Sequence, residues 1–293
     1  MKPPPFEYYA ADSAQEAVSL LAEYGPDAKV LAGGQSLVPL LALRMSRPEH
    51  LVDVNRAAEL EQQRSDADGL HLGALTRHRV TERSAGIRAA NPLLSEAARL
   101  IGHAAIRNRG TIGGSIAHAD PAAEMPTVLL ALDGAVEAVS RHGTRQIPAS
   151  GFFESYLTTA LEPDELITAV HFPPWAPGTG WSFTEFSRRS GDFGIIGVAA
   201  TLRLGDRGTI AEARIAISGG AETAVRASRT EKALIGQFPG DGTWIAAGCD
   251  ALEGLDLPAD LHGSAAYRRH LAAALIERAL RLAHERIPAR VPA

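Results

Sequence analysis

Two short glycine-rich segments of the 293-residue chain carry residue types that could do chemistry. They are Ala32-Gly33-Gly34-Gln35-Ser36-Leu37 and Thr111-Ile112-Gly113-Gly114-Ser115. Glycine has no Cβ, so backbone N–H groups beside it can approach an anion closely, and a serine hydroxyl adds one more donor. Either segment alone is also typical of a plain tight turn. As a pair, they predict two anion-binding turns that suit the two phosphates of a diphosphate group.

Other common catalytic signatures are absent from the sequence. The chain has no Gly-x-Gly-x-x-Gly segment, and no Gly-Lys-Ser/Thr follows either glycine pair, so a Rossmann or Walker-type nucleotide site is not expected. Ser36 and Ser115 lack the Gly-x-Ser-x-Gly context of a hydrolase nucleophile. The histidines form no His-x-x-His or His-Glu-x-x-His array, and we expect no metal site.

Composition narrows the class of protein further. The hydrophobic fraction of 45% and charged fraction of 22% are typical of globular domains, and the net charge of -5 predicts no nucleic-acid partner. A single cysteine, Cys249, which we expect to be a small buried residue, cannot ligate an iron–sulfur cluster. The N-terminal residues lack a signal-peptide core, and no apolar run reaches the roughly 20 residues of a membrane span, which predicts a cytoplasmic protein.

The elements around the first glycine segment follow from helix and strand signals. A capping box at Ser13 to Glu16 predicts that the first element is a helix, which ends before Gly25-Pro26. The apolar run from Lys29 to Ala32 predicts a buried strand that enters the first glycine turn. Further strands are expected over Leu51 to Val54 and Leu70 to Leu75.

The elements around the second segment are predicted in the same way. Asn91 followed by Pro92 begins a helix that runs to about Ile101. The second glycine turn comes next, and Asp120-Pro121 is expected to begin a helix that extends to about Leu132.

The remainder of the chain predicts strands first and then, after a linker and further strands, a group of helices. Strands are expected at 136–139 and 166–172, followed by a linker at Pro173 to Gly178. Beyond it, strands at 181–187, 194–204 and 213–218 precede helices at 228–235, 243–252 and 264–286. This order predicts an α+β fold with domains at 1–176 and 177–293.

Four longer stretches resemble a known family. They are Lys29 to Pro39, Ile106 to Pro121, Ser187 to Phe193, and His262 to Leu271 with the nearby Arg278-Ala279-Leu280. In content and order they are similar to the FAD-binding medium subunit of molybdenum hydroxylases, the xanthine oxidase and carbon monoxide dehydrogenase flavoprotein family. The resemblance spans nearly the whole chain, which makes the plain-turn interpretation of the glycine segments much weaker.

The resemblance implies a fold and a role. FAD would lie between two subdomains, at about 1–56 and 57–176, of a vanillyl-alcohol-oxidase-like (PCMH-type) FAD-binding domain. Residues 177–293 would form a domain with a small antiparallel sheet and helices. In the family, a large molybdopterin subunit oxidises the substrate, and electrons pass through two 2Fe-2S centres of a small subunit to this flavin and then to an acceptor. The implied assembly is a heterohexamer with two copies of each subunit.

The resemblance also implies which residues hold FAD. The pyrophosphate and neighbouring parts would contact Lys29, Val30, Leu31, Ala32, Gly33, Gly34, Gln35, Ser36, Leu37, Thr111, Ile112, Gly113, Gly114 and Ser115. Ile101 and Ile167 would give apolar contacts, with core packing as the alternative. Glu124 would accept a hydrogen bond from a ribityl or ribose hydroxyl, with a solvated charge as the alternative. Asp192 and Phe193 would lie near the isoalloxazine ring, with core packing as the alternative for Phe193.

No residue of this chain is expected to be catalytic by itself, because the flavin supplies the redox chemistry. Some relatives carry a lysine close to position 185, whereas this chain has Glu185, so stabilisation of reduced flavin by a lysine is not expected. A stand-alone flavin oxidase or reductase of the same fold, and a flavin-free scaffold, remain as alternatives. The substrate of the complex would be selected by the large subunit, so this sequence does not identify it.

Overall fold

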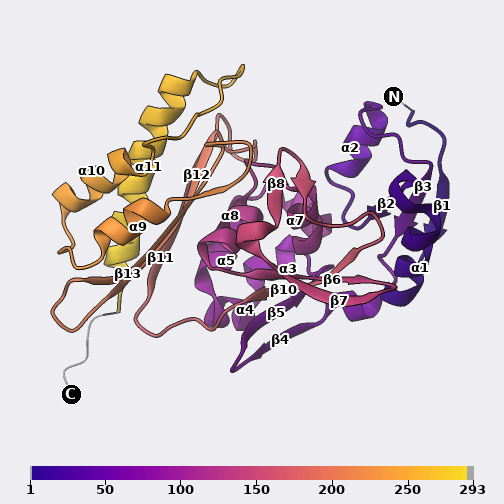
Figure 1. Ribbon diagram of the computed structural model, residues 1–293, viewed down its shortest axis with the longest axis horizontal. Helices are drawn as coiled ribbons and strands as arrows, with labels where there is room; N and C mark the ends of the chain where they lie inside the picture. Colours follow the sequence, from indigo (N-terminus) through magenta and orange to yellow (C-terminus); the bar gives the residue numbers. More distant parts are fainter. Residues whose placement is uncertain (1, 289–293) are drawn as a thin grey trace.

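A computed structural model of the chain describes residues 2–288 and arranges three sheets in a row along the longest axis of the molecule (Figure 1). The N-terminal sheet is parallel, and the other two large sheets are antiparallel. Each sheet carries its own helices, which gives the α+β architecture expected from the sequence.

The N-terminal sheet has the strand order β1-β3-β2, with β1 (Glu7–Ala10), β2 (Ala28–Leu31) and β3 (His50–Asp53). Two helices accompany it, α1 (Ala14–Tyr24) and α2 (Leu37–Ala42). Ser13 caps α1 as predicted, since its hydroxyl accepts the Glu16 N–H at 3.1 Å.

The expectation that a helix comes first is wrong, because β1 precedes α1. The strand Glu7–Ala10 is too short and too exposed for an alternating pattern, and it forms by pairing with β3, which lies about 40 residues away in the chain.

The central sheet has the order β4-β5-β10-β6-β7. Its strands are β4 (Gln63–Asp66), β5 (Gly69–Gly73), β6 (Ala135–Ser140), β7 (Gly143–Pro148) and β10 (Leu166–Phe172), and a small hairpin of β8 (Phe153–Ser155) and β9 (Thr158–Thr159) follows β7. The helices between β5 and β6 are α3 (His78–Arg83), α4 (Ala85–Ala90), α5 (Pro92–Leu100), α6 (Ala104–Arg109), α7 (Ile112–His118) and α8 (Glu124–Ala131). Asn91 caps α5, with Pro92 as its first residue, as predicted.

The start of α8 differs from the prediction. The Asp120 carboxylate accepts the Ala122 N–H at 2.9 Å, and the Asp120 carbonyl accepts the Ala123 N–H at 3.0 Å. These bonds close a turn of the Asx type, so Asp120 does not cap a helix. The helix therefore begins at Glu124, which becomes its first residue.

The C-terminal sheet has the order β11-β12-β13-β14, with β11 (Gly180–Phe186), β12 (Ile196–Leu204), β13 (Ile210–Ser218) and β14 (Val225–Arg226). Three helices, α9 (Ser228–Leu234), α10 (Asp241–Asp250) and α11 (Ala265–Glu285), lie on one side of it, while α5 and α8 of the central region lie on the other side (Figure 1).

The middle strand β12 is buried on both faces. Val198 and Ala200 belong to the core shared with α11, whereas Ala199 belongs to the core of the central region together with Phe183 of β11. Successive side chains of a strand point to opposite faces, so one strand supplies two cores. The C-terminal sheet thus also forms one wall of the central core.

Cys249 is exposed, contrary to the expectation of burial. The helix α10 approaches α11 through Gly248, where an added Cβ would lie 2.6 Å from the Ala273 carbonyl oxygen, and the neighbouring Cys249 is turned away from that contact. Within residues 2–288, no helix is both long and apolar enough to cross a membrane.

Candidate functional site

The first glycine segment forms a loop of free backbone donors between β2 and α2. Gly34 has φ +73°, a conformation that residues with a side chain rarely adopt. Among the described residues, no acceptor bonds the backbone N–H groups of the five consecutive residues from Gly33 to Leu37. We call residues 33–37 the amide loop. Five adjacent unpaired N–H groups are the donor set that binds phosphate oxygens.

A pair of polar side chains holds the carbonyl side of this loop. The Asn55 amide nitrogen donates to the Ala32 carbonyl oxygen at 2.9 Å, and the Arg77 guanidinium donates both to the Asn55 amide oxygen at 2.7 Å and to the Arg109 carbonyl oxygen at 2.5 Å. We call Asn55 and Arg77 the clamp. In a trans peptide the C=O and the next N–H point in opposite directions, so the bond to Ala32 turns the Gly33 N–H away from the clamp.

The clamp brings the two glycine segments side by side. A Cβ added to Gly33 would lie 2.4 Å from the Arg109 carbonyl oxygen and 2.8 Å from the Gly110 Cα. Gly33 is therefore required for direct backbone contact with the residues that precede Thr111. The juxtaposition expected from the pair of segments is present.

The second segment, however, is not a turn. It forms the beginning of α7, with Thr111 as the capping residue. Its N–H groups at Ile112, Gly113 and Gly114 already donate, in that order, to the Thr76 carbonyl (2.9 Å), the Ala74 carbonyl (3.0 Å) and the Thr111 hydroxyl (3.1 Å). The segment therefore begins a helix and does not form the turn expected from the sequence, and three of its amides have acceptors within the protein. Its contact with a ligand stays a prediction.

The glycines of the second segment have a packing role. A Cβ on Gly113 would lie 2.6 Å from the Ala74 Cβ, and a Cβ on Gly114 would lie 2.7 Å from the Thr111 hydroxyl oxygen. Gly113 is therefore needed where α7 meets the chain beyond β5, and Gly114 is needed beside the helix cap.

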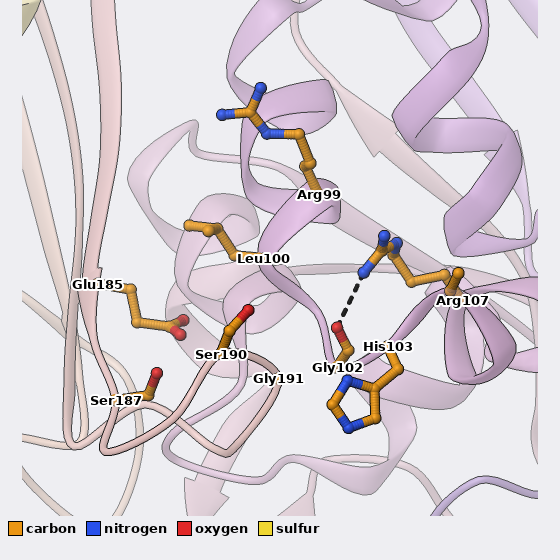
Figure 2. A pocket seen from close by; sticks show the side chains of 10 residues that line it. Arg99, Leu100, Gly102, His103, Arg107, Glu185, Ser187, Ser190 and Gly191 are labelled. Atoms are coloured by element: carbon orange, nitrogen blue, oxygen red, sulfur yellow. Dashed lines mark hydrogen bonds between the residues drawn. The ribbon is translucent and has the colours of Figure 1, made fainter.

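A cavity of about 330 Å³ lies at the other end of α6 (Figure 2). Leu100 and His103 line one side of it, and Glu185 with the loop from Ser187 to Gly191 lines the other. Gly191 packs directly on His103, because an added Cβ would lie 2.3 Å from that imidazole ring. The helix α6 connects the cavity at Ala104 with the contact point of the amide loop at Arg109. A six-residue helix rises about 9 Å at about 1.5 Å per residue.

The remaining predicted residues divide between site and core. Ile101 ends α5 and is partly buried beside the cavity-lining Leu100. Ile167 of β10 is 5% exposed and belongs to the central core, which supports its packing alternative. Asp192 and Phe193 follow the cavity loop, and Phe193 is 72% exposed, so the interpretation of Phe193 as a core aromatic is wrong.

Residues near the amide loop also differ in exposure. Lys29 is exposed, whereas Val30 and Ala32 are partly buried and pack against the N-terminal core. The Gln35 side chain folds back, and its amide nitrogen donates to the Gly33 carbonyl at 3.0 Å. That bond fixes the Gly34 N–H in the opposite direction, just as Asn55 does for Gly33.

Glu124 is not a solvated charge. Burial, together with the nearby Glu185 carboxylate, raises the pKa of Glu124 to about 8. Burial also raises the pKa of Glu185 to about 7. The Glu185 carboxyl group lines the cavity, and its charge acts on the Glu124 carboxyl group.

Sequence reasoning missed the clamp and the effect of the Glu185 charge on Glu124. The polar Asn55 directly after the apolar strand Leu51 to Val54 was a usable signal, because a polar side chain at a strand end often supports a neighbouring loop. Nothing comparable marks Arg77, whose two acceptors come from distant parts of the chain.

Comparisons with known proteins match two successive parts of the chain to two families. The family described as "FAD binding domain in molybdopterin dehydrogenase" matches residues 4–175, and the family "CO dehydrogenase flavoprotein C-terminal domain" matches residues 181–283. The 6-hydroxypseudooxynicotine dehydrogenase complex subunit alpha of Paenarthrobacter nicotinovorans is 48% identical over 96% of this chain and 95% of that protein. The carbon monoxide dehydrogenase medium chain of Hydrogenophaga pseudoflava is 40% identical over 98% of this chain and 99% of that protein.

Solved structures agree with these relatives. A chain of carbon monoxide dehydrogenase from Hydrogenophaga pseudoflava superposes with a TM-score of 0.95 at 40% identity and covers 98% of this chain and 100% of its own length. A chain of quinoline 2-oxidoreductase from Pseudomonas putida 86 gives a TM-score of 0.93 at 37% identity, with 97% and 99% covered. This chain therefore belongs, over nearly its whole length, to the FAD-binding medium-subunit family of the molybdenum hydroxylases.

Proposed function

We propose that the chain binds FAD noncovalently and acts as the electron-transfer subunit of a heteromeric molybdenum hydroxylase. The observation that carries this proposal is the amide loop, whose five free N–H groups lie one short helix away from a polar cavity. A diphosphate at the loop and a ring system at the cavity would be two parts of one extended ligand. Family membership supplies the identity of that ligand as FAD.

The residues present fit FAD. Within residues 2–288, no carboxylate accepts a hydrogen bond from the N–H groups of the amide loop, and such free donors suit a diphosphate. The cavity of about 330 Å³ lies within the range of about 300–1,000 Å³ for small-molecule sites. The residues from Thr111 to Ser115 would lie beside the ligand, because Gly33 of the amide loop contacts Gly110 directly before them. They would contact the ligand through their side chains, since the first N–H groups of the segment already have acceptors within the protein.

The proposed role of this chain is to bind FAD, to orient it and to shield it. When bound, FAD accepts electrons and passes them to an acceptor. The amide loop fixes the diphosphate, the clamp fixes the loop, and α6 sets the spacing to the cavity. Ile101, Asp192 and Phe193 would then lie around the ring, while Ile167 would act only through the core behind it.

Electrons would come from a small subunit with 2Fe-2S centres, and a large molybdopterin subunit would oxidise the substrate. Within residues 2–288, no group of three or more His, Cys, Asp or Glu side chains could hold a metal ion. The relatives are subunits of multi-subunit enzymes. We propose the same division here, in a cytoplasmic heterohexamer with two copies of each subunit.

Reconstitution tests the proposal. The isolated chain should bind FAD in a one-to-one ratio, accept electrons from a chemical reductant, and pass them to an artificial acceptor. It should oxidise none of the substrates of the family by itself. If the isolated chain turned over an organic substrate, it would be a stand-alone flavin oxidase or reductase. If it bound no FAD at all, the scaffold alternative would be correct.

A further inference from the structure

Arg268 of α11 is buried where three loops of the fold meet. It is the fourth residue of the helix and is only 5% exposed. Its Nη1 donates to the Ile195 carbonyl at 2.6 Å and to the Gly219 carbonyl at 3.1 Å, and its Nη2 donates to the Asp260 carboxylate at 2.8 Å. We call Arg268 with its two carbonyl acceptors the junction.

The helix itself does not favour an arginine at this position. A cation near the N-terminus of a helix is disfavoured by the helix dipole, and a buried guanidinium costs free energy unless its hydrogen bonds are satisfied. Asp260 compensates the charge, but its side chain is 43% exposed, so an arginine at the surface could form the same ion pair. What burial adds is the two hydrogen bonds to carbonyl groups of distant loops.

The first of these loops lines the cavity. The Ile195 N–H donates to the Phe186 carbonyl at 2.7 Å, and this bond closes the connection between β11 and β12 at its base. Within the connection, Gly191 packs directly on the His103 imidazole of the facing side (Figure 2). Because Arg268 holds the Ile195 carbonyl, it fixes the base of the loop that forms one side of the cavity.

The second loop connects the junction with the turn before α8. The Gly219 N–H donates to the Pro121 carbonyl at 2.8 Å. Gly219 has φ +71°, and an added Cβ would lie 2.2 Å from the Ile195 carbonyl oxygen, so the two loops touch where Arg268 binds both. Pro121 lies in the part of the chain that matches the FAD-binding family, whereas Arg268 lies in the part that matches the C-terminal family. The junction therefore joins the two parts.

We propose that Arg268 is a positioning residue for the flavin ring, because it holds the cavity loop (Ser187 to Gly191) in the position that shields the ring from water. This inference rests on the proposed function for the identity of the ligand and for the place of its ring. Arg268 does not line the cavity and acts through the Ile195 carbonyl. Its loss leaves two carbonyl groups without their buried donor, so the cavity loop moves and water enters beside the ring. The amide loop and the clamp still hold the diphosphate.

Hydrogen exchange of the apo-protein tests the junction without FAD. Arg268→Met keeps an unbranched apolar stem but loses every donor. The N–H groups of Ile195 and Gly219 should then exchange about tenfold faster or more, because each loop loses a charged hydrogen bond and opens locally. The N–H groups of the β12–β13 ladder report global unfolding and should change less.

Arg269→Met is the matched control. Arg269 is the next residue of α11 and also binds two backbone carbonyls, those of Leu252 at 2.6 Å and Leu255 at 2.7 Å, neither of which lines the cavity. This variant should leave the exchange of the two junction loops unchanged relative to the β12–β13 ladder. Equal exchange rates in the Arg268 and Arg269 variants would overturn the proposal.

Gly219→Ala disturbs the same junction from the other side. Its Cβ would displace the Ile195 carbonyl from Arg268, so it should speed exchange at Ile195 in the same way. This variant keeps the buried charge and its partner Asp260, so it decides the question even where Arg268→Met does not fold. Unchanged exchange at Ile195 in Gly219→Ala would contradict the junction.

The absorption spectrum of bound flavin is the second readout. In Arg268→Met and Gly219→Ala the visible bands should shift toward those of free FAD in water, because the ring becomes solvated. In Arg77→Ala, which acts on the amide loop, less FAD should bind, but the spectrum of the bound fraction should not shift. Faster exchange with an unshifted spectrum in both junction variants would show that Arg268 is a structural contact only. If the unmodified chain bound no FAD, the proposed function would be overturned instead, and the exchange rates would still decide whether Arg268 holds the two loops.

Discussion

The glycines of the two Gly-Gly segments have different structural roles, although the segments are similar in sequence. Gly34 bends the amide loop through a positive φ, whereas Gly113 lets α7 approach Ala74 closely. We expect the conformation of Gly34 to serve ligand binding, whereas the close approach at Gly113 serves the packing of the fold. Substitutions at the two positions should therefore fail in different ways.

Gly34→Val should abolish FAD retention while leaving most of the protein folded. A β-branched residue at φ +73° costs on the order of 1–3 kcal/mol, and its Cβ would press on Val38 at 3.1 Å, so the loop would rearrange. The measurement is flavin absorbance per protein after gel filtration, alongside circular dichroism. Gly178→Val is the matched control, because Gly178 has φ +76° and open space around it. Equal flavin content in Gly34→Val and Gly178→Val would contradict the assignment.

Gly113→Val should instead lower the stability of the apo-protein. The added side chain would collide with the Ala74 backbone at 2.8–2.9 Å, and overpacking of this kind costs about 1–3 kcal/mol or more. Chemical unfolding of the apo-protein measures the loss. A folded, fully stable Gly113→Val that merely lost FAD would show that Gly113 serves the ligand directly.

At the scale of elements, the clamp connects β3, the entry to α3, and α6. Arg77 alone bridges the Asn55 side chain and the Arg109 carbonyl, which lie 22 and 32 residues from it in the chain. We expect Arg77→Ala to weaken FAD binding by about tenfold without removing any predicted ligand contact, because each charged hydrogen bond contributes about 1.5–3 kcal/mol to holding the loop.

Fluorescence titration of the apo-protein with FAD measures this effect. Arg64→Ala is the control, since Arg64 lies on the exposed strand β4 and forms an ion pair with the neighbouring Asp66. Arg77→Lys should resemble Arg77→Ala, because an ammonium group does not reproduce the fork of the guanidinium. Unchanged affinity in both Arg77 variants would show that the amide loop holds its shape without the clamp.

Some of these elements could be predicted from sequence, and others could not. The caps at Ser13 and Asn91 are local signals, and both helices begin where the caps predict. The strand β1 is fixed by a distant partner, and the second glycine segment became a helix because Ala74 and Thr76 supply its acceptors. Non-local hydrogen bonds of this kind also define the clamp, so local patterns did not reveal it.

At the scale of the whole molecule, we expect the flavin end of the proposed site to face a partner subunit. Phe193 is a large apolar side chain with 72% exposure, directly after the loop that lines the cavity. In the assembled complex, Phe193→Ala should change the rate of flavin reduction or its reactivity with oxygen more than the FAD content. Because the side chain is exposed, stability of the isolated chain should change by less than about 0.5 kcal/mol.

Stopped-flow reduction of the reconstituted complex gives the rate, and absorbance gives the FAD content. Phe238→Ala is the control, because Phe238 is similarly exposed, at 68%, in the loop between α9 and α10. Identical kinetics in the two variants would mean that Phe193 has no role at the flavin.

The strand β12, buried on both faces, also sets the order in which the chain can fold during synthesis. The central core includes Phe183, Ala199, Ala216 and Ala224, so a nascent chain that ends at the linker near residue 176 still lacks one wall of that core. Domains usually fold on the ribosome from the N-terminus onward. Here the central region must wait for β13, and apolar surface on α5 and α8 stays open to chaperones until the C-terminal sheet has emerged.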